Sequence, residues 1–250
     1  MMSKTVTTAV FPSPQAASQA LAAEMASLIR ARAAEDRFAV LGLATGGTPK
    51  LLYAELVRLH REEELSFANV ITFNLDEYLG LSREHPESYW HYMHHHLFDH
   101  VDISPANIHL PDGCVAPADL EASCTAFEEA ISGAGGIDLQ VLGIGHNGHI
   151  GFNEPGAPID TRTRVIDLNE MTIRDASASF GGADRVPKRA ITMGVGTILA
   201  AKRIVLLAFG EGKRDIVQRA LSEEISPKLP ATYLQTHPDV SYFLDEAAAP

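Results

Sequence analysis

The chain alternates short apolar runs with longer segments in which apolar residues recur at helical spacing. Five runs rich in Val, Ile, Leu and Phe predict buried parallel strands, because strands covered on both faces need no polar side. These runs span residues 38–43, 70–73, 137–142, 204–209 and 240–244. The segments between them predict helices at residues 14–34, 49–62, 87–100, 117–132 and 213–221.

This alternation predicts an α/β fold with a single doubly wound, mainly parallel sheet, similar to a Rossmann fold, with helices on both faces. Parallel strands joined by helices need right-handed crossovers, which place helices on each side of the sheet. The chain has 250 residues, of which 46% are hydrophobic. That length suits one well-buried core, so we expect a single domain.

Residues 155–187 fit this alternation poorly. They are rich in Gly, Thr, Arg, Ser and Asp, with a weak helical pattern at residues 168–178. Long irregular segments are about as often surface excursions as functional loops, so both interpretations stay open. We expect a lid over residues 156–187.

Composition excludes several classes of protein. The net charge is −12 and the Lys and Arg residues are scattered, which argues against nucleic-acid binding. No apolar run reaches the roughly 20 residues that a membrane-spanning helix needs, and the first 13 residues lack signal-peptide features, so we expect a cytoplasmic protein. Cys114 and Cys124 form neither a disulfide framework nor a metal-ligand spacing.

A His-rich stretch at residues 90–96 raises the question of a metal site, because His91 and His95 share one helix face. No acidic or thiol third ligand lies at a matching spacing. We therefore expect no metal, and a helix face that is partly solvated and partly packed.

The first predicted strand leads into Thr45, Gly46, Gly47, Thr48 and Pro49. Ligands of an open α/β sheet bind beyond the carboxyl ends of its strands. Paired glycines let the backbone approach a ligand closely, and the free N–H groups of a helix start favour an anion. The segment predicts a phosphate-binding loop, with a simple tight turn as the alternative.

Two adjacent acids, Asp76 and Glu77, follow the second strand. A carboxylate in a partly apolar site has a raised pKa and can serve as a general base. Adjacent side chains point in different directions, so we expect only one to face a substrate. Exposed loop acids or a helix cap remain the alternatives.

The third strand is followed by a polar segment interrupted by four glycines, at residues 143–155. His149 lies close in sequence to Glu154, and a carboxylate beside an imidazole sets both its orientation and its affinity for a proton. Packing alone does not require such polar groups at a strand end. This segment predicts an acid–base group.

Together these stretches make the chain resemble the glucosamine-6-phosphate deaminases. The resemblance covers nearly the whole chain and rests on the blocks LATGGTP, FNLDEYLGL, HPESYW, LGIGHNGHIGFNEPG and RVPKRAITMGVGTILAAKRIVLLAFGEGK. It implies conversion of glucosamine 6-phosphate to fructose 6-phosphate and ammonia, without a cofactor. It further implies that Asp76 moves a proton between C2 and C1, that Asn147, His149 and Glu154 open the sugar ring, and that Lys213 binds the phosphate.

Two positions depart from the family pattern. Asn147 stands where some members have Asp, and an amide can orient a neighbour but cannot act as a base. Members usually carry an Arg-Phe pair in the lid that helps to bind the phosphate, and Ser179 stands here in place of that arginine. Arg174, one turn earlier, is a candidate replacement.

Two other functions compete with this prediction. A 6-phosphogluconolactonase-like hydrolase would share the fold, but the run from His149 to Glu154 favours the deaminase. A non-catalytic sugar-phosphate-binding module would need neither Asp76 nor His149, and the chain has no basic or helix-turn-helix extension. Family hexamers tend to carry additional C-terminal sequence, so we expect a monomer or a small homo-oligomer.

Overall fold

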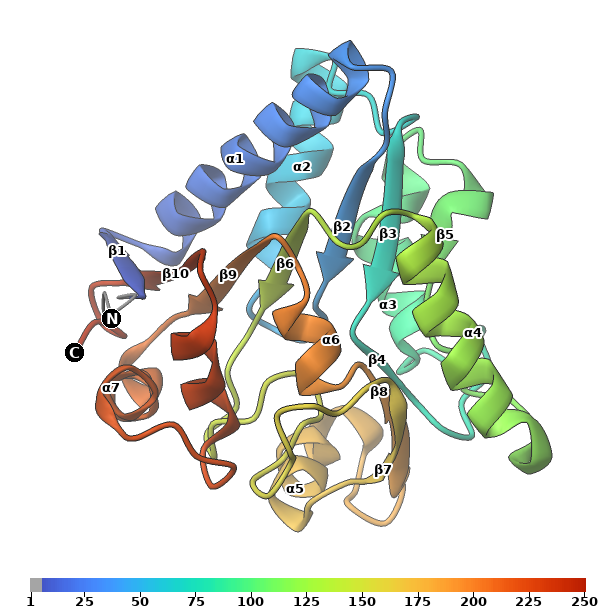
Figure 1. The fold of residues 1–250 in the computed structure, drawn as a ribbon, viewed down its shortest axis with the longest axis vertical. Coiled ribbons are helices and arrows are strands. Elements are labelled where there is room, and N and C mark those ends of the chain that lie inside the picture. The colour runs from blue at the N-terminus through green and yellow to red at the C-terminus, as the bar shows by residue number, and fades with distance from the viewer. Residues whose placement is uncertain (1–5) are drawn as a thin grey trace.

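The computed structural model describes residues 6–250 and contains a seven-stranded sheet in which all neighbouring strands are parallel. The strand order is β1-β10-β9-β6-β2-β3-β5 (Figure 1). After the edge strand β1, the chain enters the middle of the sheet at β2 and winds outward, first through β3 and β5 and then through β6, β9 and β10. All five strands expected from the apolar runs are present. The strands are β1 (Thr7–Phe11), β2 (Ala39–Leu43), β3 (Val70–Asn74), β5 (Ile108–His109), β6 (Leu139–Leu142), β9 (Arg203–Ala208) and β10 (Val240–Asp245).

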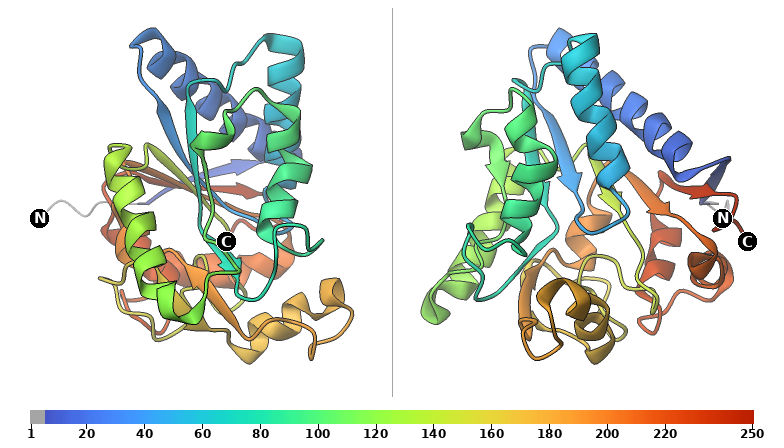
Figure 2. Two further views of the ribbon diagram at one scale, coloured as in Figure 1. Left: turned by 90° about the vertical axis from the view of Figure 1, so that its right-hand side faces the viewer. Right: turned by 180° about the vertical axis from the view of Figure 1, so that it is seen from behind.

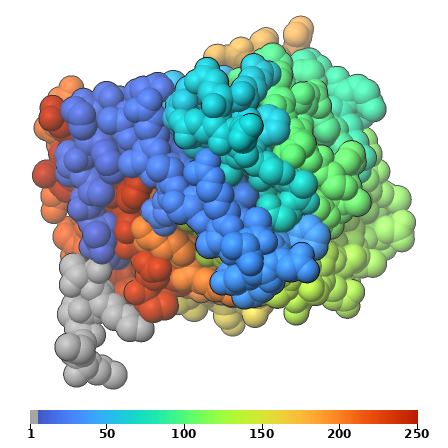
Figure 3. Space-filling model, turned by 90° about the horizontal axis from the view of Figure 1, so that it is seen from above, coloured from blue at the N-terminus to red at the C-terminus, as the bar shows by residue number. Residues whose placement is uncertain are grey.

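Helices cover both faces of this sheet, and each face has its own apolar core (Figure 2). On β2, Leu41 and Leu43 point into one core while Val40 points into the other, which is why the strand is apolar at every position. One face carries α1 (Pro14–Ala34), α2 (Lys50–Glu63) and α3 (Tyr89–His96), and the other carries α4 (Leu120–Gly133), α6 (Val195–Leu199) and α7 (Arg214–Ser222). Figure 3 shows blue α1 beside cyan α2.

A second, antiparallel sheet lies beyond the carboxyl ends of the large sheet (Figure 1). Its strand order is β4-β8-β7, and α5 packs beside it. The strands of this sheet are β4 (Asp76–Tyr78), β7 (Arg164–Asp167) and β8 (Arg189–Thr192), and the helix is α5 (Glu170–Phe180). The region expected to be irregular therefore contains a strand and an 11-residue helix, and the expectation of a single sheet was incomplete.

Helix α3 is shorter than the expected span of residues 87–100. It begins at Tyr89 because Ser88 caps it, the Ser88 Oγ accepting a hydrogen bond from the His91 N–H at 3.1 Å. It ends at His96, and a short 3₁₀ turn follows at Phe98–His100. Within residues 6–250, no helix combines the length and the apolar character needed to cross a membrane.

Candidate active site

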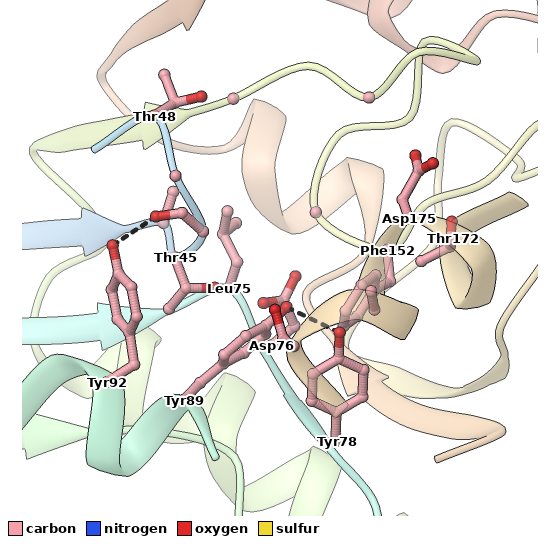
Figure 4. A pocket seen from close by; sticks show the side chains of 18 of the residues that line it. Thr45, Thr48, Leu75, Asp76, Tyr78, Tyr89, Tyr92, Phe152, Thr172 and Asp175 are labelled. Atoms are coloured by element: carbon pink, nitrogen blue, oxygen red, sulfur yellow. Dashed lines mark hydrogen bonds between the residues drawn. The ribbon is translucent and has the colours of Figure 1, made fainter. Parts of the chain in front are cut away.

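A cavity of about 570 Å³ opens at the carboxyl ends of β2, β3 and β6, between the large sheet and α5 (Figure 4). This is where a doubly wound sheet is expected to bind a ligand. It brings together segments far apart in the sequence, including Thr45, Asp76, His149, Ser179 and Lys213.

The loop after β2 forms one wall of the cavity. Thr45, Gly46, Gly47 and Thr48 all line it, and Gly46 has a φ of +91°, which favours glycine. The Tyr92 hydroxyl donates a hydrogen bond of 2.6 Å to the Gly46 carbonyl. No side chain caps α2, which begins directly after this loop, so its first N–H groups are free to bind an anion.

Asp76 lines the cavity from the first position of β4 and is 5% exposed. The backbone of the preceding Leu75 is fixed on both sides, donating to the Leu43 carbonyl at 3.1 Å and accepting from the Met193 N–H at 2.7 Å. Burial, and then the charge of Glu77, raises the pKa of Asp76 to about 8. A carboxylate with such a pKa is a stronger base than an exposed aspartate.

Glu77 points away from the cavity, so only one of the two adjacent acids faces it, as the alternation of a strand requires. Its carboxylate accepts hydrogen bonds from the first N–H groups of α3, at Tyr89 and Trp90. The pair thus combines two of the roles considered from the sequence: Asp76 faces the cavity, and Glu77 caps a helix.

The loop after β6 places His149 in the cavity wall, with Glu154 behind it. The His149 Nδ1 lies 3.5 Å from Glu154 Oε2, an ion-pair contact when the imidazole is protonated. Although burial opposes ionisation, contacts with His149 and Thr172 hold the pKa of Glu154 below its ordinary value. A Cβ at Gly145 would lie 2.2 Å from the His149 ring, so glycine is needed there for the ring to pack.

Asn147 lies outside the cavity lining and orients the same group. Its side-chain amide donates to Glu154 Oε2 at 2.6 Å, and its side-chain oxygen accepts from the His149 N–H at 3.2 Å. The structure therefore brings Asn147, His149 and Glu154 together, with His149 as the member that reaches the cavity.

Helix α5 forms the opposite wall and contacts the β6 loop directly. The Thr172 hydroxyl donates a hydrogen bond to Glu154 Oε1, and the Asp175 carboxylate lies 3.4 Å from His146 Nδ1. Phe180 packs edge-on against Tyr78, with ring centroids 5.4 Å apart. These contacts attach the segment expected to be a lid to the rest of the site.

The cations available to a phosphate differ from those that the sequence suggested. Lys213 lines the cavity, where its Nζ donates to the Ile144 carbonyl at 2.8 Å, and burial lowers its pKa while Asp175 opposes that effect. Arg174 is exposed and lies outside the lining, whereas its neighbour Asp175 lines the cavity. The wall around Ser179 thus carries an acid and no arginine.

Sequence reasoning missed several residues of this cavity. Their main signal was the HPESYW block, which contains Tyr89 and leads into Tyr92, but nothing local showed that α3 faces the β2 loop. Thr172 and Asp175 lie in a segment with no strong pattern. The missed lining residues include Lys50, Tyr78, Tyr89, Tyr92, His146, Phe152, Thr172 and Asp175.

No group of three His, Cys, Asp or Glu side chains within residues 6–250 is arranged to hold a metal ion. In the His-rich helix, the rings of His91 and His95 stack on each other with centroids 6.2 Å apart. The neighbouring His94 pairs instead with Asp99, at 2.7 Å.

Residues 12–242 match the protein family described as glucosamine-6-phosphate isomerases/6-phosphogluconolactonase. The chain is 48% identical over 224 residues to the glucosamine-6-phosphate deaminase of Thermoanaerobacter pseudethanolicus, covering 90% of this chain and 88% of that protein. It is 50% identical over 229 residues to the glucosamine-6-phosphate deaminase of Bacillus velezensis, covering 92% and 94% of the two chains.

The fold agrees with these sequence matches. A solved structure described as a monomeric glucosamine-6-phosphate deaminase superimposes with a TM-score of 0.93 at 44% identity, covering 97% of this chain and 98% of the other. The 6-phosphogluconolactonase of Trypanosoma brucei superimposes with a TM-score of 0.78 at 21% identity, over 98% of each chain. That second likeness concerns the fold alone.

Proposed function

The chain belongs to the family of glucosamine-6-phosphate isomerases and 6-phosphogluconolactonases. We propose that an amino sugar phosphate binds in its cavity, where the sugar ring is opened and the sugar is isomerised and deaminated, with Asp76 as the base. It is an enzyme of the deaminase type, which converts glucosamine 6-phosphate and water to fructose 6-phosphate and ammonia. The identity of about half to named deaminases over most of the chain supports this activity.

Ring opening comes first, because a closed pyranose has no acidic hydrogen at C2. His149 transfers a proton from the C1 hydroxyl to the ring oxygen, so that the C1–O5 bond breaks and an aldehyde forms. Glu154 stabilises the imidazolium at 3.5 Å, and Asn147 holds Glu154 in place. The Asn147 side chain is an amide, which cannot act as a base, so its role is to orient Glu154.

Proton transfer follows. Asp76 removes the proton from C2, which the aldehyde has made acidic, while O1 takes up a proton; Asp76 then returns its proton to C1 as the amino group loses one. The resulting imine at C2 adds water and releases ammonia, leaving the ketose. The raised pKa of Asp76, about 8, suits this step because a general base works best when its pKa lies near the working pH.

The phosphate binds at the other end of the cavity. Thr45, Gly46, Gly47 and Thr48 supply backbone and hydroxyl donors at the start of α2, and Lys213 supplies the positive charge. This site lacks a lid arginine, which predicts weaker phosphate binding than a site with a bidentate guanidinium.

Residues 156–187 act as the lid of a single-domain enzyme that works as a monomer or a small homo-oligomer. The contacts of Thr172 and Asp175 with the β6 loop support the lid, because movement of α5 would separate it from Glu154 and His146. Closing it would exclude water from the acid–base group.

One observation carries this proposal: Asp76, His149, Lys213 and the β2 loop line the same cavity. A lactonase needs a water activated beside an ester, and ester hydrolysis does not require a base that removes a proton from C2. The test is ammonia release on addition of glucosamine 6-phosphate, with hydrolysis of 6-phosphogluconolactone measured in parallel. Release of ammonia supports the deaminase, and lactone hydrolysis without ammonia release would support the rival.

A further inference from the structure

Glu77 is a buried acid for which the proposed reaction has no direct use. Its side chain is 2% exposed and lies behind the cavity wall, where β4 pairs with β8 and Glu77 lies opposite Ile191. Burying a charged carboxylate costs several kcal/mol unless it is paired or hydrogen-bonded. Glu77 must therefore have a compensating set of partners.

Those partners are three backbone N–H groups, two at the start of α3 and one in β4 itself. Oε1 accepts from the Tyr89 N–H at 3.0 Å and from the Tyr78 N–H at 2.9 Å, and Oε2 accepts from the Trp90 N–H at 3.0 Å. Ser88 takes the next N–H of the helix, that of His91. A negative charge at a helix N-terminus is further favoured by the helix dipole.

The helix that Glu77 holds reaches the phosphate-binding loop. Tyr89 and Tyr92 of α3 both line the cavity, and the Tyr92 hydroxyl bonds to the Gly46 carbonyl at 2.6 Å. A continuous set of contacts thus runs from Asp76 through the adjacent Glu77 to α3, and from α3 to the loop at Gly46. The two ends of this set are the proposed base and the proposed phosphate site.

Glu77 also acts on Asp76 through its charge. Burial raises the pKa of Glu77 to about 7, with the three N–H groups opposing this and Asp112 adding to it. After burial, the charge of the adjacent Glu77 is the second cause of the raised pKa of Asp76, because an ionised Glu77 makes Asp76 harder to ionise. Tyr78 and Tyr89 also lie beside Asp76; burial raises the pKa of Tyr78 to about 12 and that of Tyr89 well above its ordinary value, so both stay neutral.

We infer that Glu77 is a positioning residue for the proposed deaminase reaction: its carboxylate fixes α3 against β4, and its charge strengthens Asp76 as a base. This inference rests on the proposed function. It predicts that removing the charge and shortening the side chain have different effects, which a merely structural role would not produce.

The test compares Glu77→Gln, which removes the charge, with Glu77→Asp, which keeps it on a shorter chain. Glu129→Gln is the matched control, because Glu129 is an exposed acid on α4 outside the cavity. The Asp76 carboxyl is titrated by ¹³C NMR, with its resonance assigned from Asp76→Asn. Its midpoint should fall by about one pH unit or more in Glu77→Gln, since like charges at close range shift a pKa by roughly that amount.

The kinetics should separate the two roles. In Glu77→Gln the acid limb of kcat/KM should move to lower pH together with the Asp76 midpoint. In Glu77→Asp the acid limb of kcat/KM should stay at the wild-type pH while KM rises, because the loosened α3 no longer fixes the Gly46 loop. An unchanged Asp76 midpoint in folded Glu77→Gln would overturn the inference.

A further measurement keeps the test decisive. If Glu77→Gln does not fold, the wild-type titration decides: Asp76 and Glu77 must titrate as a coupled pair, and independent titration of the two carboxyls would contradict the inference. The titrations need no substrate, so they are independent of the proposed activity. Coupled titration in an enzyme that releases no ammonia would reject the proposed function alone, and active wild type with uncoupled titration would reject Glu77's role alone.

Discussion

The Thr172 hydroxyl of α5 donates a hydrogen bond to the Glu154 carboxylate of the β6 loop. This contact joins the segment proposed as a lid to the group proposed to open the sugar ring. It also helps to hold the pKa of Glu154 below its ordinary value, which keeps that carboxylate ionised beside His149.

Thr172→Val should therefore lower kcat/KM for glucosamine 6-phosphate by about tenfold or more. A hydrogen bond to a charged group contributes roughly 1.5–3 kcal/mol, and valine keeps the shape while removing the donor. Steady-state kinetics measure the effect, with Ser177→Ala on the same helix as control, since the Ser177 hydroxyl donates to the Arg174 carbonyl of its own helix. Equal activity of the two variants would mean that the lid does not support Glu154.

His149→Gln should damage ring opening and spare the later proton transfer. The expected result is a loss of about 10²–10⁴-fold with the cyclic substrate, the usual contribution of one acid–base group. A 4,5-dideoxy analogue, which can form neither the pyranose nor the furanose ring, should be processed with a much smaller loss. Equal losses with both compounds would remove His149 from ring opening.

The negative charge of Asp175 predicts an effect on KM. Asp175 lines the cavity and acts on Lys213, so its carboxylate opposes a phosphate there. Asp175→Asn should lower KM, and Ser179→Arg should lower it further, by roughly ten- to a hundredfold for a bidentate contact. Little change in kcat is expected, because only uniform binding is added.

Glu170→Gln is the control for that prediction, since Glu170 lies on the same helix but outside the cavity lining. It should leave KM unchanged. A higher KM in Ser179→Arg would show that residue 179 does not face the phosphate, and an equal KM in Asp175→Asn would show that Asp175 is too far from it.

The sequence predicted the large sheet better than the small one. The central strands are apolar throughout because both faces are covered, as at Val40 and Leu41, and that pattern is visible locally. β1 was missed because it lies at the sheet edge and is partly exposed. β4 was missed because its sequence is Asp-Glu-Tyr, and its burial depends on N–H groups of α3 more than ten residues away.

The candidate site shows the same division. Loops next to strand ends, such as the one at Gly46, could be placed because parallel strands bring their carboxyl ends together. The wall made by α5 could not, because its contacts with Glu154 and His146 arise only once β7 and β8 pair. Asp175 was overlooked for this reason, and Arg174 was considered as a replacement for the missing lid arginine.

The raised pKa of Asp76 predicts a trade-off between activity and stability. The pKa rises from 3.8 to about 8 on folding, so the folded state holds the proton more tightly, and stability falls as pH rises through this interval. Asp76→Asn removes this cost and should raise Tm relative to wild type at pH 9 but much less at pH 4. Calorimetry at both pH values tests it, and a Tm difference independent of pH would contradict the raised pKa.

The base assignment is tested most directly by cleavage of the C2–H bond, followed by ¹H NMR with glucosamine 6-phosphate in D₂O. Wild-type enzyme should cleave this bond as fructose 6-phosphate and ammonia form. Folded Asp76→Asn should still bind the substrate but cleave its C2–H bond about 10²–10⁴-fold more slowly. Loss of the C2 proton at the wild-type rate in that variant would contradict the assignment of Asp76 as the base.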